Sequence, residues 1–304
     1  MKQPYSFIAV IFTLLFISPA HLVFAADKTE RIAVAGGSIT EIIYRLNEQH
    51  RIVGVDSTSQ FPSEAKQHPL LGYVRNVSVE GVLSLKPDLL IGEKDTGPTK
   101  ILNQIKAAGI NTVIIEEDDT LSAINKKIRL VSQLLQVEAK GELLLDDILI
   151  DLSALQYARK KIKTAPRVLF LLSASNGSPI AAGNTTSAHT AIVEAGGINV
   201  LAQFQGWEKL SPEAAFSLNP DVIVVMNRGD NILTELKNLP HFKYSNAVKH
   251  NAVFTIDGNY LLGFGPRTPQ AIVELGTMIH PNFPLPEGYK LRYPNNAGIN
   301  TAGH

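Results

Sequence analysis

Short apolar runs alternate with stretches of helical periodicity along most of the chain. The runs that have the length of buried strands are Arg31–Ala35, Ile52–Val55, Leu89–Ile91 and Thr112–Ile115. After the first run, Ser38 followed by Glu41 predicts a capping box, and apolar residues then recur on one face of a helix. The order strand, helix, strand predicts an α/β fold with mainly parallel sheets.

The chain contains an internal repeat. Residues 79–91 (VEGVLSLKPDLLI) return as residues 212–224 (PEAAFSLNPDVIV), with Glu, Ser-Leu-x-Pro-Asp and a following apolar run in register. Proline disfavours a helical conformation in the residue before it, so each copy predicts a short helix that ends before a buried parallel strand. The repeat therefore indicates two similar lobes.

The chain length agrees with two lobes, because 304 residues exceed a typical domain of roughly 100–200. We expect two Rossmann-like lobes joined by one long α-helix, since Leu121 to about Lys163 contains apolar residues at helical spacing and no proline. A helical bridge predicts a small hinge motion. The predicted divisions are a signal peptide at 1–25, a first lobe at 26–120, a connecting helix at 121–164, a second lobe at 165–284 and an irregular tail at 285–304.

The first residues have the pattern of a secretory signal peptide. Lys2 precedes an apolar run from Phe7 to Ile17, and small residues follow, with a cleavage site after Ala25. The run is too short to cross a bilayer as a stable helix, which disfavours an uncleaved membrane anchor. We therefore expect export to the periplasm.

Composition narrows the classes of partner. The chain has no Cys, which excludes disulfides, thiolate metal sites and a lipid-accepting cysteine. Lys plus Arg and Asp plus Glu number 28 each, so no excess of positive charge points to nucleic acid or a membrane surface. A small molecule is the expected partner.

Gly36-Gly37-Ser38 after the first predicted strand suggests a turn that could place a phosphate at a helix N-terminus. The glycine pattern of dinucleotide sites is incomplete, and only Asp56 stands near the end of the second strand. The simpler interpretation of the glycines is a tight strand-to-helix turn. A periplasmic nucleotide-using enzyme is the alternative from another functional class.

Several segments resemble the helix-bridged periplasmic binding proteins for haem, cobalamin and ferric siderophores. The resemblance spans residues 31–283 and is closest to the haem-binding members. The segments that carry it are GGSITE (36–41), VGVDST (53–58), LKPD (85–88), AGN (182–184), AGGIN (195–199) and, for haem, LGYVR (71–75). The resemblance implies a binding protein for iron acquisition rather than an enzyme.

The resemblance also implies an axial iron ligand, Tyr73. A phenolate oxygen is a hard donor suited to ferric iron, and Tyr is an established type of axial haem ligand. Arg75 lies two residues on, where its charge would favour the phenolate or pair with a haem propionate.

Candidate ligand contacts in the second lobe lie on loops that follow strands. Arg228 is the expected propionate partner, and Tyr260 and Phe264 are candidate ring contacts. His189 is a candidate second axial ligand, as in some relatives, although the loop at 173–177 lacks the histidine of the pattern. Phe61 and Trp207 are further apolar candidates.

Glu80 and Glu213 occupy equivalent places in the repeat. In the resembled family, acidic residues at such positions meet arginines on the two permease subunits, which implies docking to an ABC permease dimer with its ATPase. An outer-membrane haem receptor upstream is compatible with this function. The same fold leaves a ferric siderophore or cobalamin open as the ligand.

Overall fold

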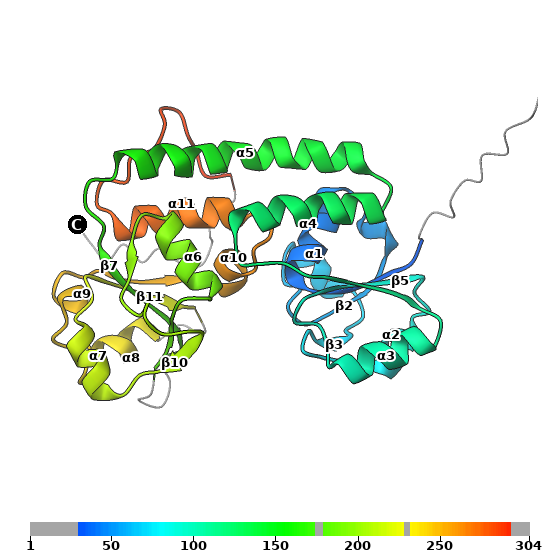
Figure 1. Ribbon diagram of the computed structural model, residues 1–304, viewed down its shortest axis with the longest axis horizontal. Coiled ribbons are helices and arrows are strands. Elements are labelled where there is room, and N and C mark those ends of the chain that lie inside the picture. Colours follow the sequence, from blue (N-terminus) through cyan, green and yellow to red (C-terminus); the bar gives the residue numbers. More distant parts are fainter. Residues whose placement is uncertain (1–29, 174–178, 228–231, 293–304) are drawn as a thin grey trace, which may run out of the picture.

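The computed structural model describes residues 30–173, 179–227 and 232–292. Two α/β lobes lie side by side beneath a long helix (Figure 1). In the described ranges no helix is long and apolar enough to span a membrane. The fold class predicted from the sequence is confirmed.

Lobe one is built on a parallel sheet with strand order β2-β1-β5-β6, plus a small antiparallel β3–β4 hairpin. The four strands predicted for this lobe are all present, and their observed ends lie within about two residues of the predicted ends. The elements are β1 (Ile32–Ala35), α1 (Gly37–Arg45), β2 (Ile52–Val55), β3 (Gly72–Tyr73), β4 (Asn76–Val77), α2 (Val79–Ser84), β5 (Leu89–Glu93), α3 (Thr99–Ala107) and β6 (Asn111–Ile115), with 3-10 turns at Gln49–Arg51 and Ser63–Gln67.

Lobe two has the strand order β10-β8-β7-β11-β12, with β9 also paired to β7. β7, β11 and β12 are parallel, whereas β8 runs antiparallel to β7. The elements are β7 (Arg167–Ser173), β8 (Ile180–Ala182), α6 (Ser187–Glu194), β9 (Ile198–Asn199), β10 (Trp207–Lys209), α7 (Pro212–Leu218), β11 (Val222–Met226), α8 (Ile232–Asn238), α9 (Asn246–Lys249), β12 (Val253–Ile256), α10 (Gly258–Leu262) and α11 (Thr268–Ile279).

The connection between the lobes differs from the single helix expected over 121–164. It consists of α4 (Leu121–Leu134) and α5 (Glu138–Lys161), and Gln136 between them has a left-handed φ of 58°. The two helices pack closely, because a Cβ on Gly141 would stand 2.4 Å from the Ser132 Oγ. The periodicity of both helices continues across the break, which explains why the sequence pattern did not reveal it.

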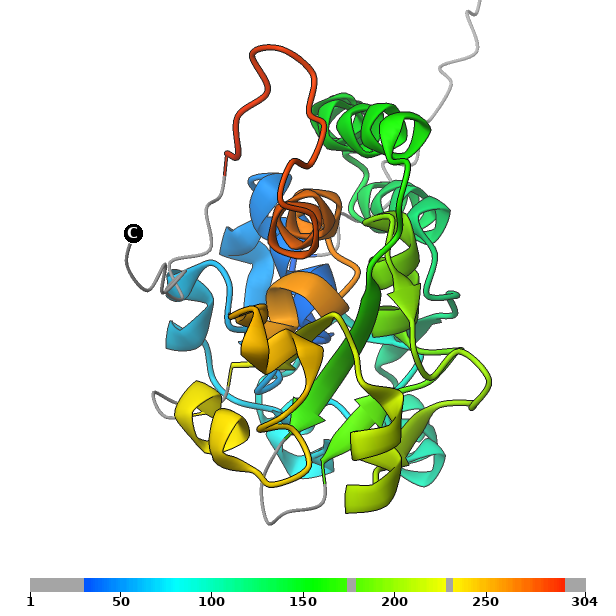
Figure 2. The same ribbon diagram turned by 90° about the vertical axis from the view of Figure 1, so that its left-hand side faces the viewer.

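The bridge between the lobes is therefore α5 alone. Its first half contributes Leu144 and Ile148 to the core of lobe one, and its second half contributes Ala154 and Leu155 to the core of lobe two. In lobe two, α11 lies between α5 and the sheet (Figure 2). The bridge is thus an integral part of both hydrophobic cores.

The two copies of the repeat have the same local structure. Ser78 caps α2 by accepting from the Gly81 N–H, and Ser211 caps α7 in the same way. The residue before each proline, Lys86 or Asn219, has a positive φ, of 46° and 37°. Such a conformation is unfavourable for a residue with a side chain, so its occurrence in both copies supports duplication.

An arginine fixes the end of the helix in each copy. The Arg31 guanidinium donates to the Leu85 and Lys86 carbonyls, and the Arg167 guanidinium donates to the Leu218 carbonyl. The Asp that follows each proline accepts from the backbone N–H of the same arginine. These hydrogen bonds tie α2 to β1 and α7 to β7.

Residues 281–292 contain no helix or strand, and the rest of the tail predicted at 285–304 lies outside the described residues. The described segment is nevertheless anchored to the bridge. The Tyr289 hydroxyl donates to Asp151 over 2.7 Å, and Arg292 forms ion pairs with Asp147 and Asp151.

The equivalence of the two caps predicts equal losses of stability. Ser78→Ala and Ser211→Ala should each lower the free energy of unfolding by about 1 kcal/mol, because each leaves a helix N–H without its acceptor. Ser84→Ala and Ser217→Ala are matched controls, since those hydroxyls donate to carbonyls within the same helices. Urea denaturation followed by circular dichroism would measure the losses, and unequal cap effects would contradict the equivalence.

Candidate functional site

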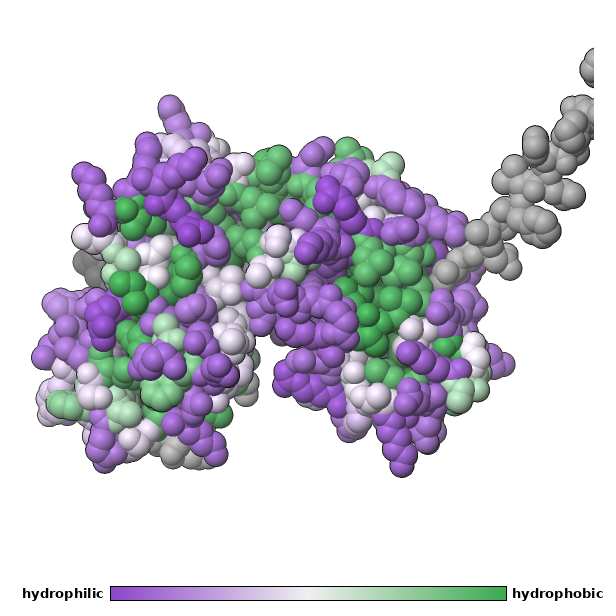
Figure 3. Space-filling model, viewed as in Figure 1, coloured by the Kyte–Doolittle hydropathy of each residue, from purple (hydrophilic) through white to green (hydrophobic). Residues whose placement is uncertain are grey.

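A cleft of about 480 Å³ lies between the lobes. It forms an open notch on the side away from α5, with hydrophilic side chains along much of the lobe-one wall (Figure 3). Glu93 ends β5, Glu117 follows β6, and Met226 ends β11, so the carboxyl ends of strands from both sheets face the cleft. This is the position at which open parallel sheets bind ligands, as the sequence predicted.

Tyr73 and Arg75 lie together on the lobe-one wall of the cleft. Leu71 and Val74 are buried and anchor the β3–β4 hairpin, which leaves the Tyr73 side chain 46% exposed. The Arg75 Nη1 lies 3.5 Å from the Tyr73 hydroxyl, and its Nε and Nη2 donate to Asp95 over 3.2 and 2.5 Å. The hairpin thus presents an accessible phenol beside an oriented cation.

The hydrogen bond to Asp95 raises the pKa of Arg75, with partial opposition from burial. The guanidinium therefore stays charged at every physiological pH.

The aromatic candidates divide between the cleft and the cores. Trp207 and Phe61 line the cleft, and Trp207 is 38% exposed. Phe264 also borders the cleft but is only 3% exposed, because its ring packs in the core of lobe one. Phe264 therefore contributes little accessible surface to a ligand.

The proposed ring contact at Tyr260 is not supported by its position. Its side chain is 2% exposed within the core of lobe two, and its hydroxyl accepts from Gln270 Nε2 over 2.8 Å. Burial also raises the pKa of its phenol well above the ordinary value. Asp257 caps α10 by accepting from the Tyr260 N–H, and Tyr260 is not among the residues that line the cleft.

His189 lies on α6 behind the cleft wall, which is formed at this point by Thr185, Thr186 and Ser187. Its Nδ1 is 3.3 Å from the Asn199 amide nitrogen, and His189 is not among the residues that line the cleft. The structure therefore does not bring His189 together with Tyr73. Arg228 lies outside the described residues.

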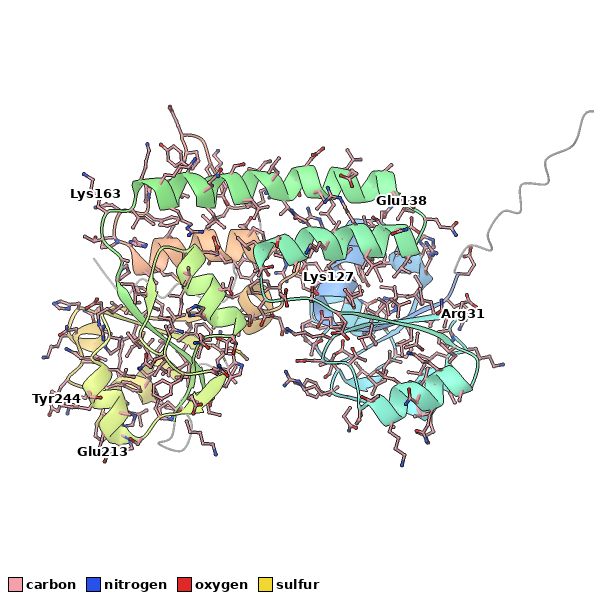
Figure 4. All side chains as sticks on the ribbon, viewed as in Figure 1. Arg31, Lys127, Glu138, Lys163, Glu213 and Tyr244 are labelled. Carbon is pink, nitrogen blue, oxygen red and sulfur yellow. The ribbon has the colours of Figure 1, made fainter. Side chains whose placement is uncertain are left out.

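A charged cluster at the floor of the cleft was missed by the sequence reasoning. Lys127 belongs to α4, and its side chain is fully buried at the junction of the lobes (Figure 4). Its Nζ forms an ion pair with Glu117 over 2.5 Å. The same Nζ donates to the Ser38 hydroxyl, which donates to Glu93. A detectable signal existed, since Lys127 occupies the apolar face of its helix between Ile124 and Val131.

The prediction that Ser38 and Glu41 form a capping box is wrong, because both side chains bind other partners. Gly36 is the N-cap of α1, while the Ser38 side chain serves Glu93 and Lys127. The Glu41 carboxylate instead accepts from the backbone and side chain of Arg267 in lobe two.

The start of α1 is also closed to a nucleotide phosphate. The N–H groups of Gly36, Gly37 and Ser38 donate to Asp56, the Thr58 hydroxyl and Glu93. A Cβ on Gly36, whose φ is 146°, would stand 2.5 Å from the Glu93 side chain. The glycines therefore serve a tight turn against a carboxylate of the protein itself, and an anion would be repelled there.

Glu80 and Glu213 are exposed and lie outside the cleft. They stand in the first turns of α2 and α7, at the ends of the lobes away from α5 (Figures 1 and 4).

Burial raises the pKa of both Glu93 and Glu117, and the charge of Lys127 is the largest opposing effect for each. Lys127→Met should therefore destabilise the protein by about 3–5 kcal/mol at pH 8, since it leaves carboxylates without their cation. The loss should shrink towards pH 5, because carboxyls with raised pKa values take up protons in the folded state.

Lys126→Met is the matched control, since Lys126 is exposed on the same helix. Denaturant unfolding at several pH values would measure both variants. A pH-independent loss in Lys127→Met would contradict the charge explanation.

Within the described part of the chain, His, Cys, Asp and Glu side chains do not gather in threes that could hold a metal ion.

Comparisons with known proteins agree with this geometry. Residues 32–260 match the family model described as periplasmic binding protein. The structure of the periplasmic haem-binding protein RhuT from Roseiflexus sp. RS-1, in apo form, is 35% identical with a TM-score of 0.79, and the match covers 84% of this chain and 100% of that one.

Curated relatives cover a similar span. The uncharacterised ABC transporter substrate-binding lipoprotein YvrC of Bacillus subtilis is 29% identical over 81% of this chain and 78% of its own length. The vitamin B12-binding protein of Vibrio parahaemolyticus is 25% identical over 84% and 90%. The chain therefore belongs to the periplasmic binding protein family, as a substrate-binding protein of the ABC-transporter type and not an enzyme.

Proposed function

We propose that the protein captures haem in the cleft between its lobes and delivers it to an ABC permease with its ATPase. The observation that carries this proposal is the exposed Tyr73 phenol on the cleft wall, beside the Arg75 guanidinium. We also propose that residues 1–25 act as a signal peptide, so that the mature protein begins at Ala26 in the periplasm.

The proposed iron ligand is the Tyr73 oxygen. Ferric iron favours hard anionic oxygen donors, and Arg75 would stabilise the phenolate while the Asp95 carboxylate holds the guanidinium in place. Arg75 would thus act mainly through Tyr73, and Arg228 remains our proposed partner for a propionate.

The opposite wall suits the face of a porphyrin. Trp207 projects from β10, and Met226 and Leu262 line the same side of the cleft. Flat aromatic and flexible thioether side chains cover an apolar macrocycle without specific polar demands. The resemblance to RhuT, a haem-binding protein by name, supports the same ligand.

A haemin titration tests the ligand assignment. Tyr73→Phe should weaken binding at least about tenfold and abolish the phenolate-to-iron charge-transfer band, because the ring remains but its oxygen is lost. Absorption spectra of the purified variant and wild-type proteins would measure the affinity for haemin and the charge-transfer band. The mass of the protein purified from the periplasm would separately identify the signal-peptide cleavage site.

Tyr244→Phe is the matched control, since Tyr244 is an exposed tyrosine outside the cleft (Figure 4). An unchanged spectrum in Tyr73→Phe would refute the ligand assignment.

Cobalamin is the second candidate ligand, because vitamin B12-binding relatives match over as much of the chain as other relatives do. A ferric siderophore is a third possibility within the same fold. Wild-type protein that binds cyanocobalamin but gives no spectral change with haemin would favour the cobalamin function.

We propose that Glu80 and Glu213 dock the protein on the permease. Their helices have the same caps and the same terminal hydrogen bonds, so the two carboxylates are presented in equivalent settings at the same end of each lobe. A pair of equivalent acidic sites suits a permease built from two related subunits that each present a basic residue.

Charge reversal tests the docking proposal. Glu80→Arg and Glu213→Arg should each reduce the stimulation of ATP hydrolysis by the loaded protein, measured with its permease in liposomes, while haemin binding stays unchanged. Glu138→Arg is the matched control, because Glu138 is exposed at the start of α5 on the opposite side (Figure 4). Equal stimulation by all three variants would refute the docking role.

A further inference from the structure

The bridge helix α5 carries an apolar patch on its outer face, the side turned away from both sheets. Leu143, Leu149 and Ile150 are 70%, 56% and 54% exposed, and hydrophobic side chains gather over the middle of the helix (Figure 3). Two grooves of about 540 and 520 Å³ flank this part of the helix, and Leu149 and Ser153 line both of them. The patch is therefore a ridge between two hollows.

The patch lies outside the packing of the lobes. The buried side of α5 supplies Leu144 to the core of lobe one and Leu155 to the core of lobe two. Leu143, Leu149 and Ile150 belong to none of the hydrophobic cores of the described residues. A surface helix ordinarily has one apolar stripe, which faces its core, so exposed apolar residues on the opposite side of α5 indicate a further contact.

The centre of the patch coincides with the centre of the helix. α5 runs from Glu138 to Lys161, so its midpoint falls between Leu149 and Ile150. A second copy of α5 that lies antiparallel across this midpoint is related to the first by a two-fold axis. The axis brings Leu149 to Leu149 and Ile150 to Ile150 of the second copy, and each ridge then meets a groove of the other molecule.

The residues on either side of the midpoint are complementary in the same register. Equal steps outward along the two helices place Asp146 opposite Ser153, a carboxylate opposite a hydroxyl donor. They also place Leu143 beside the ring of Tyr157, which is half-buried on the same face. The register that pairs the apolar centre therefore leaves no like charges facing each other at these positions.

Exposed charges of opposite sign stand at the two ends of α5. Glu138 begins the helix, and Lys160 and Lys161 end it at the far side of the bridge (Figure 4). An antiparallel copy brings each acidic end to a basic end, whereas a parallel copy would place like charges together. The cation nearest the acidic end, Lys140, already pairs with Glu48.

The helix macrodipole alone does not account for this arrangement. It favours acidic residues in the first turn and basic residues in the last turn of any helix. It gives no reason for exposed apolar residues at the midpoint, and its effect does not reach the middle turns where Asp146 and Ser153 lie. Charge complementarity and the apolar centre together favour one partner, a second copy of the same helix.

We propose that the outer face of α5 is a self-association surface through which two copies of the protein pair back to back in antiparallel orientation. The cleft, Glu80 and Glu213 lie on the side away from α5, so all of them stay accessible in the dimer (Figures 1 and 4). One helix pair buries less than a standard interface, so we expect a dissociation constant on the order of 10–100 μM. The proposal is independent of the identity of the ligand.

Sedimentation equilibrium of the full mature chain tests the association. Wild-type protein should shift from monomer to dimer as its concentration rises through the expected dissociation constant. Ile150→Glu should weaken the dimer at least about tenfold, because it brings two carboxylates together at the axis. Leu70→Glu is the matched control, since Leu70 is an exposed aliphatic residue outside α5. A wild-type protein that stays monomeric, or equal weakening by both variants, would overturn the proposal.

Single cysteines test the orientation, because the chain has no native Cys. Ile150→Cys should form a disulfide-linked dimer under mild oxidation, since this residue meets its own copy at the axis. Glu138→Cys should not link to itself, because its two copies lie more than about 30 Å apart in the antiparallel dimer. A mixture of Glu138→Cys and Lys161→Cys should link. Self-linking of Glu138→Cys would overturn the antiparallel pairing.

The C-terminal residues are the other candidate for covering the patch, because residues 286–289 line one of the two grooves. Removal of residues 293–304 should leave the dissociation constant unchanged. A dimer that forms only after this removal would assign the patch to the chain's own tail and overturn the proposal. Haemin titration of Ile150→Glu should match the wild type, so a failure of haem binding and a failure of dimerisation are separate results.

Discussion

The relative position of the two lobes depends on the hydrogen bonds and the ion pair that the buried Lys127 ammonium forms with both of them. The Lys127 ammonium has no access to water, so hydrogen bonds and carboxylates must replace its hydration. Glu117 and Ser38 from lobe one supply part of this shell, and the Phe264 carbonyl from lobe two supplies the rest. Because these partners meet only when the lobes adjoin, the electrostatic requirement of one side chain constrains the cleft above it.

Features encoded locally could be predicted from the sequence. The repeat of Glu and Ser-Leu-x-Pro-Asp predicted a short helix that ends before proline and then a buried strand, and both copies have this structure. The serine caps and the left-handed residue before each proline were added by the structure. Apolar periodicity likewise located the strands of lobe one and the long helices. Tyr73 was singled out by the resemblance of residues 71–75 to haem-binding proteins and not by a local pattern, and the β3–β4 hairpin places it on the cleft wall.

Features that depend on partners distant in sequence were not predictable in this way. Ser38 and Glu41 fit a capping box by spacing, yet their actual partners are Lys127, Glu93 and Arg267. Tyr260 comes shortly after a strand, as a cleft residue would, but its ring packs in the core of lobe two and its hydroxyl accepts from Gln270. The break at Gln136 leaves the helical periodicity intact on both sides. In each case the local pattern allowed two outcomes, and tertiary packing selected between them.

The two lobes are alike where they face outward and different where they face each other. The outer helices α2 and α7 each begin with a serine cap and a glutamate in the first turn, and an arginine from a strand region donates to the carbonyls at the end of each helix. Most of their other residues differ. At the cleft, lobe one contributes a phenol, a guanidinium and carboxylates, whereas the lobe-two wall is built largely from small, apolar and aromatic residues. An asymmetric cleft suits a ligand with two unlike faces towards the protein, one ligating and one apolar. Equivalent outer ends and unlike inner loops are what the proposed functions require of a duplicated fold, since the proposed docking sites are paired and the proposed ligand site is single.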